Sequence, residues 1–468
     1  MSKDFLEWLD QQQGREYELH ARHINPSFVK MLQTIGFDKG FVRGQGCYLY
    51  DAAGNRYLDL LTGWGVFALG RNHPKVRSVI EAVLSRELPN LVRMDCSLLA
   101  GLVAEKLTSH TAPHKGQPLT RVFFCNSGTE SVEGAIKFAR CFTGKQRILY
   151  CDHAFHGLTV GSLSLNGARF FRERFGDLMP WTESVPFNDL PALDRALARK
   201  DVAAFFVEAV QGKSLKVVSD GYLEDAQKLC RRAGALLVAD EVQCGMGRTG
   251  RWFAYQHYPN VEPDIVCVAK ALSGGYVPVG AVITAPKIMD SVFNTMERCV
   301  IHSNTFGQND LAMAAALATL TVMEEDGVVE NAATLGTYAM AQMESIKREC
   351  PFAAEVRGKG LMFGIDFKRP ENSRKLQAAW DALHALNFGV FGQMVIIPLM
   401  QEHRILAQVA GYHTEVIKFL PPLTITKDDI DWFLSAMQQV LQNTVRVPGA
   451  AWDTVMNLAR GAMRSYVR

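Results

Sequence analysis

The 468-residue sequence lacks a long apolar run, a strong net charge and a recognisable export signal. No uninterrupted hydrophobic stretch approaches the ~20 residues that a membrane-spanning helix needs. Lysine and arginine total 50 against 48 acidic residues, without a long basic block, so we expect no nucleic-acid partner. The start, MSKDFLEWLDQQQGREYELH, is charged throughout and has no signal-peptide apolar region.

The ten cysteines form no C-x-x-C pair and no cluster with the spacing of a metal site, so we expect no bound metal. Several of them, Cys125, Cys151 and Cys267, lie in strand-like runs. In a chain of this length they are expected to be buried, reduced thiols. That use of cysteine favours a cytoplasmic location.

Alternation of strands and helices predicts the fold class. Short, nearly continuous apolar strands separated by helices run from residue 120 to residue 285, which is typical of a mostly parallel α/β sheet covered on both faces. Residues 47–61 predict a β-hairpin around an Ala-Gly-Asn turn, and a helix is expected after Pro74. Residues 356–367 and 403–423 look like antiparallel strands, which indicates a smaller α+β part.

The end of the sequence, residues 450–468, has an amphipathic helical pattern. Its apolar face carries Trp452, Val455, Met456, Ala459, Met463 and Tyr466, and it is flanked by Arg460, Arg464 and Arg468. We expect this helix to dock on its own protein. Contact with a membrane surface is the alternative.

Chemically suggestive residues follow several of the predicted strands. The segment Ser127–Glu130 joins a strand to a helix, where free backbone N–H groups attract phosphate, although Ser and Thr are also ordinary N-caps. Asp240 ends another strand, at the edge where open α/β sheets bind ligands, although such an Asp is often structural. Lys270 lies in an otherwise apolar run, where an ammonium is costly unless it is paired or neutral.

A single chemistry needs these features together. A phosphate cradle, a carboxylate for a pyridinium nitrogen and a lysine that forms a Schiff base are the parts of a pyridoxal 5'-phosphate (PLP) site. A lysine bound to the cofactor aldehyde does not remain a buried ammonium. Once released, it is a nearby amine that can move protons.

These residues belong to a set of motifs that resembles the class III (ornithine/ω-amino type) aminotransferases of PLP fold type I. The resemblance covers roughly residues 40–435 and rests on LYDAAGNRYLDLLTGWGV, LGRNHPKV, NSGTESVEGAIKFAR, HAFHGLT, VEAVQG, DEVQCGMGRTG, AKALSGG, SNTFGQND and LPPLTIT, in this order. It implies a large seven-stranded sheet domain and a smaller α+β domain built from both chain ends. We expect an N-terminal part of the small domain in residues 1–80, a large PLP-binding domain in residues 81–330, and a C-terminal small domain in residues 331–468.

The resemblance implies roles for individual residues. Lys270 is the catalytic, imine-forming lysine, and Asp240 holds the ring nitrogen of PLP protonated. The other cofactor residues implied are Gly128 and Thr129 at the phosphate, Phe155 and Val242 on the two ring faces, His156 nearby, and Gln243 near the ring hydroxyl with support from Glu208.

Thr305 is similar to a residue that reaches the phosphate of the neighbouring subunit. That similarity implies a homodimer with shared active sites. A turn-capping role for the Thr305 hydroxyl is the alternative, and it would leave the dimer unsupported.

The sequence departs from the ornithine-type pattern at two positions near the substrate. Lys213 stands where those enzymes have Glu, and Lys418 stands where many have the Arg that grips an α-carboxylate. Two cations cannot form the Glu–Arg pair, and Lys lacks the bidentate fork of Arg. Solvated rim positions are the alternative for both lysines. Trp64 is expected to line the substrate channel, with a core position as its alternative.

The function expected is amino transfer between an amino-acid donor and an aldehyde or ketone that corresponds to a non-α, long-chain or bulky amine. Residues 392–423 also resemble a subgroup that includes hopanoid-side-chain and other long-chain-amine aminotransferases. A diamine or ornithine-type enzyme, and a PLP decarboxylase, racemase or aminomutase, are the alternatives on the same scaffold. A cofactor-binding protein without turnover and a membrane-recruited assembly component are the alternatives from other classes.

Overall fold

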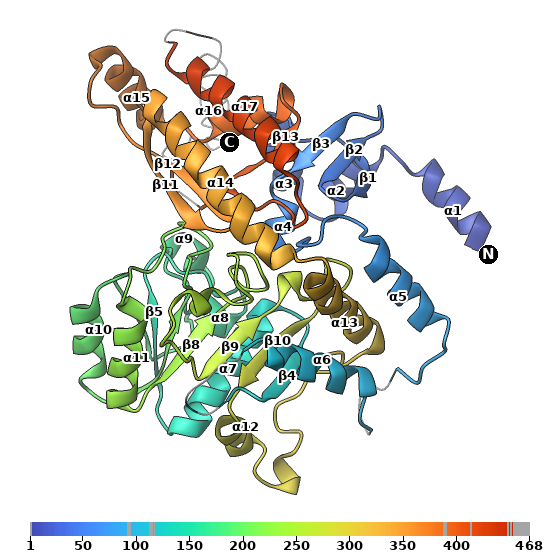
Figure 1. Cartoon of the computed structure of the whole chain (residues 1–468), viewed down its shortest axis with the longest axis vertical. Coiled ribbons are helices and arrows are strands. Elements are labelled where there is room, and N and C mark those ends of the chain that lie inside the picture. Colours follow the sequence, from blue (N-terminus) through green and yellow to red (C-terminus); the bar gives the residue numbers. More distant parts are fainter. Residues whose placement is uncertain are drawn as a thin grey trace.

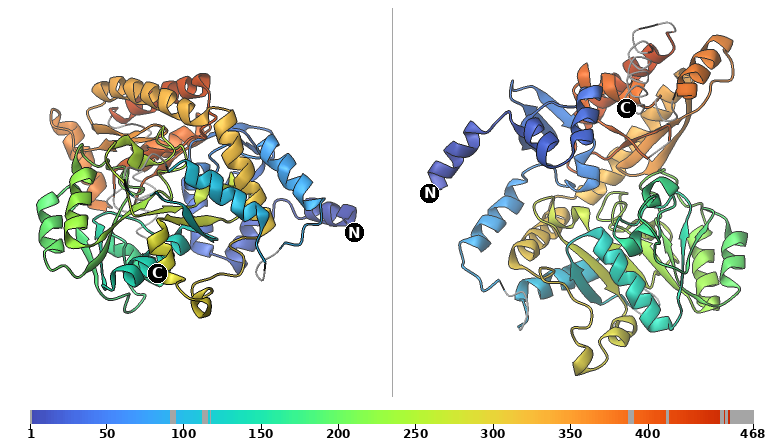
Figure 2. Two further views of the ribbon diagram at one scale, coloured as in Figure 1. Left: turned by 60° about the horizontal axis from the view of Figure 1, so that its bottom comes forward. Right: turned by 180° about the vertical axis from the view of Figure 1, so that it is seen from behind.

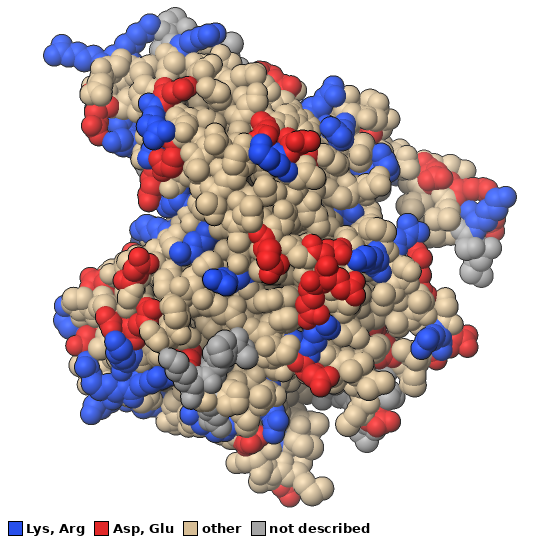
Figure 3. All heavy atoms as spheres, viewed as in Figure 1, with Lys and Arg blue, Asp and Glu red and all other residues tan. Residues whose placement is uncertain are grey.

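The computed structural model describes residues 2–90, 95–111, 116, 118–386, 391–411, 414–446, 449 and 452. A seven-stranded sheet with its helices fills the lower half of Figure 1, and two four-stranded sheets with theirs fill the upper half. Basic and acidic side chains are interspersed over the face drawn in Figure 3.

The central sheet is mostly parallel. Its strands lie in the order β4 (Arg121–Cys125), β10 (Gly280–Thr284), β9 (Ile265–Val268), β8 (Leu236–Asp240), β7 (Val202–Val207), β5 (Arg147–Cys151) and β6 (Thr182–Val185). Neighbours from β9 to β6 are parallel, whereas β10 is antiparallel to both β4 and β9. The predicted α/β class with a seven-stranded, mostly parallel sheet is therefore confirmed.

Both faces of this sheet are covered. Side chains of a strand alternate between the two faces, and every residue of β5, β7, β8, β9 and β10 is buried. The surrounding helices are α6 (Leu98–Ser109), α7 (Gly128–Thr143), α8 (Val160–Leu163), α9 (Arg169–Arg172), α10 (Leu190–Leu197), α11 (Tyr222–Ala233), α12 (Pro286–Val292) and α13 (Asp310–Glu325), with the 3-10 turns η1 (Ala254–His257), η2 (Lys270–Ser273) and η3 (Met296–Arg298). Cys125, Cys151 and Cys267 are buried, free thiols, as predicted.

The two smaller sheets combine both ends of the chain (Figures 1 and 2). One has the order β1 (Phe41–Gln45), β2 (Tyr48–Asp51), β3 (Arg56–Asp59), β13 (Ile405–Leu406), and the other has β11 (Ala353–Lys359), β12 (Met362–Phe367), β15 (Val416–Phe419), β14 (Gln408–Val409). Their helices are α1 (Ser2–Gln11), α2 (Glu16–His23), α3 (Pro26–Ile35), α4 (Thr62–Gly65), α14 (Val328–Glu349), α15 (Arg374–Leu386), α16 (Gln393–Gln401) and α17 (Lys427–Thr444). The helix α5 (Pro74–Leu84) packs against α13 of the lower half.

One strand assignment needs correction. Residues 403–423 were expected to form antiparallel strands, and β14 and β15 do pair in that way. β13 instead runs parallel to β3, because the backbone of Leu58 and Leu60 donates to the carbonyls of Arg404 and Leu406. The hairpin of β2 and β3 and the helix that begins at Pro74 agree with the prediction.

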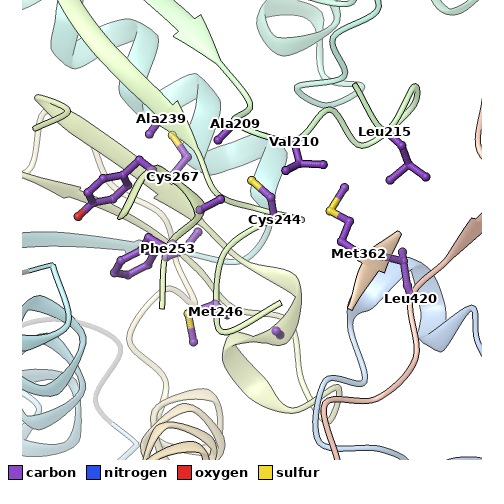
Figure 4. Packing of buried hydrophobic residues seen from close by; sticks show 14 of the residues in the cluster. Ala209, Val210, Leu215, Ala239, Cys244, Met246, Phe253, Cys267, Met362 and Leu420 are labelled. Carbon is purple, nitrogen blue, oxygen red and sulfur yellow. The ribbon is translucent and has the colours of Figure 1, made fainter. Parts of the chain in front are cut away.

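The hydrophobic core continues from the lower half into the upper half. Figure 4 shows Val210 and Leu215, from the loop after β7, facing Met362 of β12 and Leu420, which follows β15. Burial of this continuous apolar surface stabilises the fold and fixes the upper sheets against the loops of the lower one.

The predicted C-terminal helix falls largely outside the described residues. Trp452 is described and buried, its Nε1 donates to the carbonyl of Thr444 at 2.8 Å, and its ring lies 5.8 Å from that of Phe352. Within the described ranges, no helix combines the length and the apolar character needed to cross a membrane.

A close helix–turn contact gives a test of the packing. Gly336 in α14 has no room for a side chain, because a Cβ there would lie 2.2 Å from the carbonyl carbon of Gly360 in the β11–β12 turn. We predict that Gly336→Ala lowers the free energy of unfolding by about 1–3 kcal/mol through overpacking.

The matched control is Gly101→Ala in α6, where a Cβ would meet nothing within 4 Å. That change should stabilise the protein by about 0.5–1 kcal/mol. Urea unfolding measures both variants, and equal effects of the two substitutions would contradict the packing described.

Candidate active site

A cavity of about 770 Å³ lies where strand ends of the central sheet meet the upper sheets. Parallel strands bring their carboxyl ends to one edge, which is where open α/β sheets bind ligands. The loops that follow β4, β5, β7, β8 and β9 line this cavity, and Lys418 of β15 closes it from the other side. The predicted convergence of Ser127–Thr129, Asp240 and Lys270 is therefore found.

Lys270 begins the turn η2, two residues after the end of β9. Its backbone is left-handed, with φ of 41°, a conformation that costs free energy in a residue with a Cβ. Burial lowers the pKa of its ammonium, while the charges of Asp240 and Glu208 oppose that shift. Lys270 thus lines the cavity with an amine whose pKa is lowered.

Asp240 is held in one orientation by two donors. Its Oδ2 lies 2.7 Å from Nδ1 of His156, and its Oδ1 accepts from the backbone N–H of Val242 at 3.0 Å. Burial alone would lower the pKa of His156, but the hydrogen bond and charge of Asp240 outweigh it, and the pKa is raised. His156 Nε2 is buried and has no hydrogen-bond partner in the described part of the chain.

Glu208 joins two loops of the cavity wall. It directly follows β7, and its Oε2 accepts from the backbone N–H of Phe155 at 3.1 Å while its Oε1 accepts from that of Gly212 at 2.8 Å. Burial raises the pKa of this carboxyl. A Cβ on Gly212 would lie 3.2 Å from the Glu208 carboxylate and 2.8 Å from Gln243 Oε1, so glycine lets the three segments meet.

The start of α7 presents backbone donors to the cavity. Ser127 is the N-cap and accepts from the N–H of Glu130, as the ordinary capping explanation predicted. The N–H groups of Gly128 and Thr129 are at helix positions that have no intrahelical acceptor. A Cβ on Gly128 would lie 2.7 Å from Cγ1 of Val242, so glycine allows this helix start and Val242 to lie in contact.

The hydroxyl of Thr129 is part of a cluster that the sequence did not indicate. Its Oγ1 lies 2.7 Å from that of Thr159 and 2.6 Å from Oγ of Ser162. Thr159 also donates to Glu133. These contacts fix the segment after His156 against the start of α7.

Lys418 is a buried residue. Its side chain is 1% exposed, so a solvated rim position does not hold for it. Its ammonium donates to the backbone carbonyl of Gly212 and to Oε1 of Gln243, the latter at 2.9 Å. Gln243 Nε2 in turn donates to the carbonyl of Trp64 at 3.0 Å. Burial lowers the pKa of Lys418 well below its usual range, and the charges of Lys213 and Lys270 add to this.

Lys213 is half-buried and lines the same cavity. Its Nζ lies 4.7 Å from the ring centre of Phe155 and 5.2 Å from that of Phe171. The two rings meet edge to face at 5.4 Å. Burial lowers the pKa of Lys213, and the charge of Lys270 lowers it further.

Of the two remaining predicted residues, Trp64 lines the cavity and Thr305 does not. Trp64 lines the cavity and is 53% exposed, so it is not a core residue. Thr305 is exposed and lies outside the lining of the cavity in its own chain. Sequence reasoning missed Phe171, which has no motif around it, and Tyr276, which the proximity of the SGG turn to Lys270 could have indicated.

Comparison with known proteins identifies a family pattern. The class-III aminotransferase pattern matches residues 38–441. Aminotransferase PigE of a Serratia species is 35% identical over 92% of this chain, which spans 54% of that relative's length. Putrescine aminotransferase of Pectobacterium atrosepticum is 34% identical over 90% of this chain and 87% of its own. A PLP-bound amine transaminase from an uncultivated Pseudomonas species superposes with a TM-score of 0.75 at 28% identity, over 86% of this chain and 94% of its own.

The two backbone contacts of Glu208 give a test of the cavity wall. Glu208→Ala leaves the part-buried N–H of Phe155 and the buried N–H of Gly212 without this acceptor, and each unpaired donor is expected to cost about 1–3 kcal/mol. Glu208→Gln retains one acceptor oxygen and should cost roughly half as much. Urea unfolding of the purified variants measures these differences.

Glu105→Ala in α6 is the control, since that residue is exposed and its removal should change stability by less than about 0.5 kcal/mol. Equal losses of stability in the Ala and Gln variants of Glu208, or a loss no larger than in the control, would contradict the proposed role of Glu208 in joining the two loops.

Proposed function

The chain belongs to the class-III aminotransferases, and on that premise we propose that it exchanges an amino group between an amino-acid donor and a carbonyl compound whose amine is terminal and bulky, long or largely apolar. The observation that supports this most directly is the convergence of Lys270, Asp240 and the start of α7 on one cavity. Each supplies a different requirement of PLP-dependent amino transfer.

We propose PLP as the cofactor, and the cavity fits its chemistry. The N–H groups of Gly128 and Thr129 suit the dianionic phosphate at a helix N-terminus. Phe155 and Val242 would enclose the ring, and the Asp240 carboxylate suits a protonated ring nitrogen. The unpartnered Nε2 of His156 is a further polar group available near that ring. When bound, PLP supplies an aldehyde that captures the amine and a ring that withdraws electrons from the amine carbon.

The residues of this chain would then divide the work. The pKa of Lys270 is lowered by burial. Its Nζ would accept a proton from the carbon that carries the donor's amino group and later return a proton, which is a general acid–base role. His156 fixes Asp240, so the carboxylate keeps its orientation toward the ring nitrogen. Gln243 is proposed to contact the ring hydroxyl, and the hydrogen bonds with Lys418 and Trp64 orient its amide.

The walls of the cavity support an apolar substrate. Trp64, Val66, Leu158 and Phe171 line it. Lys213 adds positive charge beside them, which repels the second ammonium of a diamine. A monoamine with a long or bulky hydrocarbon part brings no second charge toward Lys213, and its hydrocarbon part can pack against these four side chains.

We also propose a homodimer in which Thr305 of one subunit reaches the phosphate of the other. The exposed position of Thr305, outside the cavity of its own chain, supports this arrangement. A cytoplasmic location is proposed because all ten cysteines are free thiols. The division of the chain near residues 81 and 331 remains our proposal for its domains.

A diamine substrate is the second candidate. It is favoured by the 34% identity to a putrescine aminotransferase, and it is opposed by Lys213.

Lys270 gives the first test of the proposed function. Borohydride reduction of the protein with bound PLP should attach the cofactor to the tryptic peptide that contains Lys270, and mass spectrometry locates the label. Lys270→Ala should lose that label and reduce transamination by more than about 100-fold, because the general acid–base step is removed. Lys216→Ala, outside the cavity lining, is the control. Transamination at a near-normal rate in the Lys270 variant would refute the assignment.

A matched pair of amines tests the substrate class. Butan-1-amine and putrescine have the same carbon chain, but putrescine ends in an ammonium that would approach Lys213. We expect kcat/KM to be at least roughly tenfold higher for butan-1-amine, a difference of about 1.4 kcal/mol. Hexan-1-amine should be at least as good as butan-1-amine. Better turnover of putrescine than of either monoamine would instead establish the second candidate.

A further inference from the structure

Lys213 and Lys418 both line the cavity, but their ammonium groups are in different situations. Lys418 is fully buried and already donates to Gly212 and Gln243. Lys213 is half-buried, and no carboxylate or hydrogen-bond acceptor contacts its Nζ among the residues described. Within the described part of the chain, that ammonium lies against the rings of Phe155 and Phe171, while Glu208 and Lys270 act on it through their charges. Lys213 is therefore a cation with unused hydrogen-bond donors beside the reaction site.

Gly212, the residue before Lys213, is held by hydrogen bonds at both its N–H and its carbonyl. The N–H of Gly212 donates to Glu208 at 2.8 Å, and its carbonyl accepts from Lys418. The side chain of Lys213 has a flexible four-carbon stem with three rotatable donors. Its base is thus held still while its ammonium can turn from the two rings toward the cavity.

Aromatic rings are weaker partners for an ammonium than a carboxylate is. A ring offers the attraction of its quadrupole, whereas a carboxylate offers charge-assisted hydrogen bonds. A carboxylate that enters this cavity would therefore displace the rings. A substrate without a charge would leave the ammonium where it lies now.

We propose that Lys213 is the carboxylate anchor of the amino-acid donor and of the keto acid formed from it. It leaves Phe155 and Phe171 when a carboxylate is bound and returns to them when an apolar carbonyl substrate occupies the cavity. This inference rests on the proposed function for the identity of the substrates. It locates carboxylate recognition at Lys213 and removes it from Lys418, whose donors hold the wall together.

Binding of two probes of equal chain length tests the anchor without turnover. Hexanoate carries the carboxylate, and hexan-1-ol carries none. Calorimetry on the holoenzyme should give tighter binding of hexanoate, and Lys213→Gln should weaken hexanoate by roughly 10- to 100-fold while leaving hexan-1-ol unchanged. Lys213→Arg should retain hexanoate binding, and Lys216→Gln, in the same loop but outside the lining, should change neither probe.

The inference is overturned if Lys213→Gln binds hexanoate as the unaltered protein does, or if both probes weaken in parallel. A parallel loss would mean that Lys213 only supports the wall. Failure of the proposed function has a different signature: no amino acid converts the cofactor in the unaltered protein, whatever hexanoate does. In a protein that does transfer amino groups, Lys213→Gln should also lose affinity for amino-acid donors but not for hexan-1-amine.

Discussion

The site depends on the compensation of charges that are buried together in one cavity. Asp240 and Glu208 face Lys270, Lys418 and the histidine at position 156, with Lys213 beside them. Burial lowers the pKa of each of the three lysines, and the nearby carboxylates of Glu208 and Asp240 oppose that shift only in part. A cavity with this balance favours anionic ligands. A cofactor phosphate and a substrate carboxylate are both of that kind.

The fold places these charged side chains at strand ends and holds them there with a few hydrogen bonds. Asp240 and Glu208 are placed by β8 and by the segment that follows β7, and Lys270 by the left-handed turn after β9. Gly212 then connects the lower and upper halves, because Glu208 binds its N–H and Lys418 of β15 binds its carbonyl. Gly212 therefore both lines the cavity and links the sheets of the two halves. A substrate-binding change at this wall is therefore expected to alter stability as well.

The sequence predicted the parts of this structure that depend on a local pattern of residues, or on a set of residues that few kinds of chemistry require. Continuous apolar strands separated by helices indicate a covered parallel sheet, and Asp240 with Lys270 indicates its ligand edge. Strand direction was not predicted for β10, because an apolar run carries no direction. The pairing of β13 with β3 joins residues far apart in the chain and has no local signal. The same reason hid the contact of Lys418 with Gly212 and the position of Phe171 beside Lys213.

The central claim, amino transfer by this cavity, is tested most directly by following both halves of one exchange in the holoenzyme. An amino-acid donor should convert the pyridoxal form to the pyridoxamine form and release one equivalent of its keto acid, and added hexanal should restore the original absorbance. Release of carbon dioxide or of a racemised amino acid without keto acid would contradict the account. Restoration of the absorbance by keto acids but never by hexanal would contradict its substrate class.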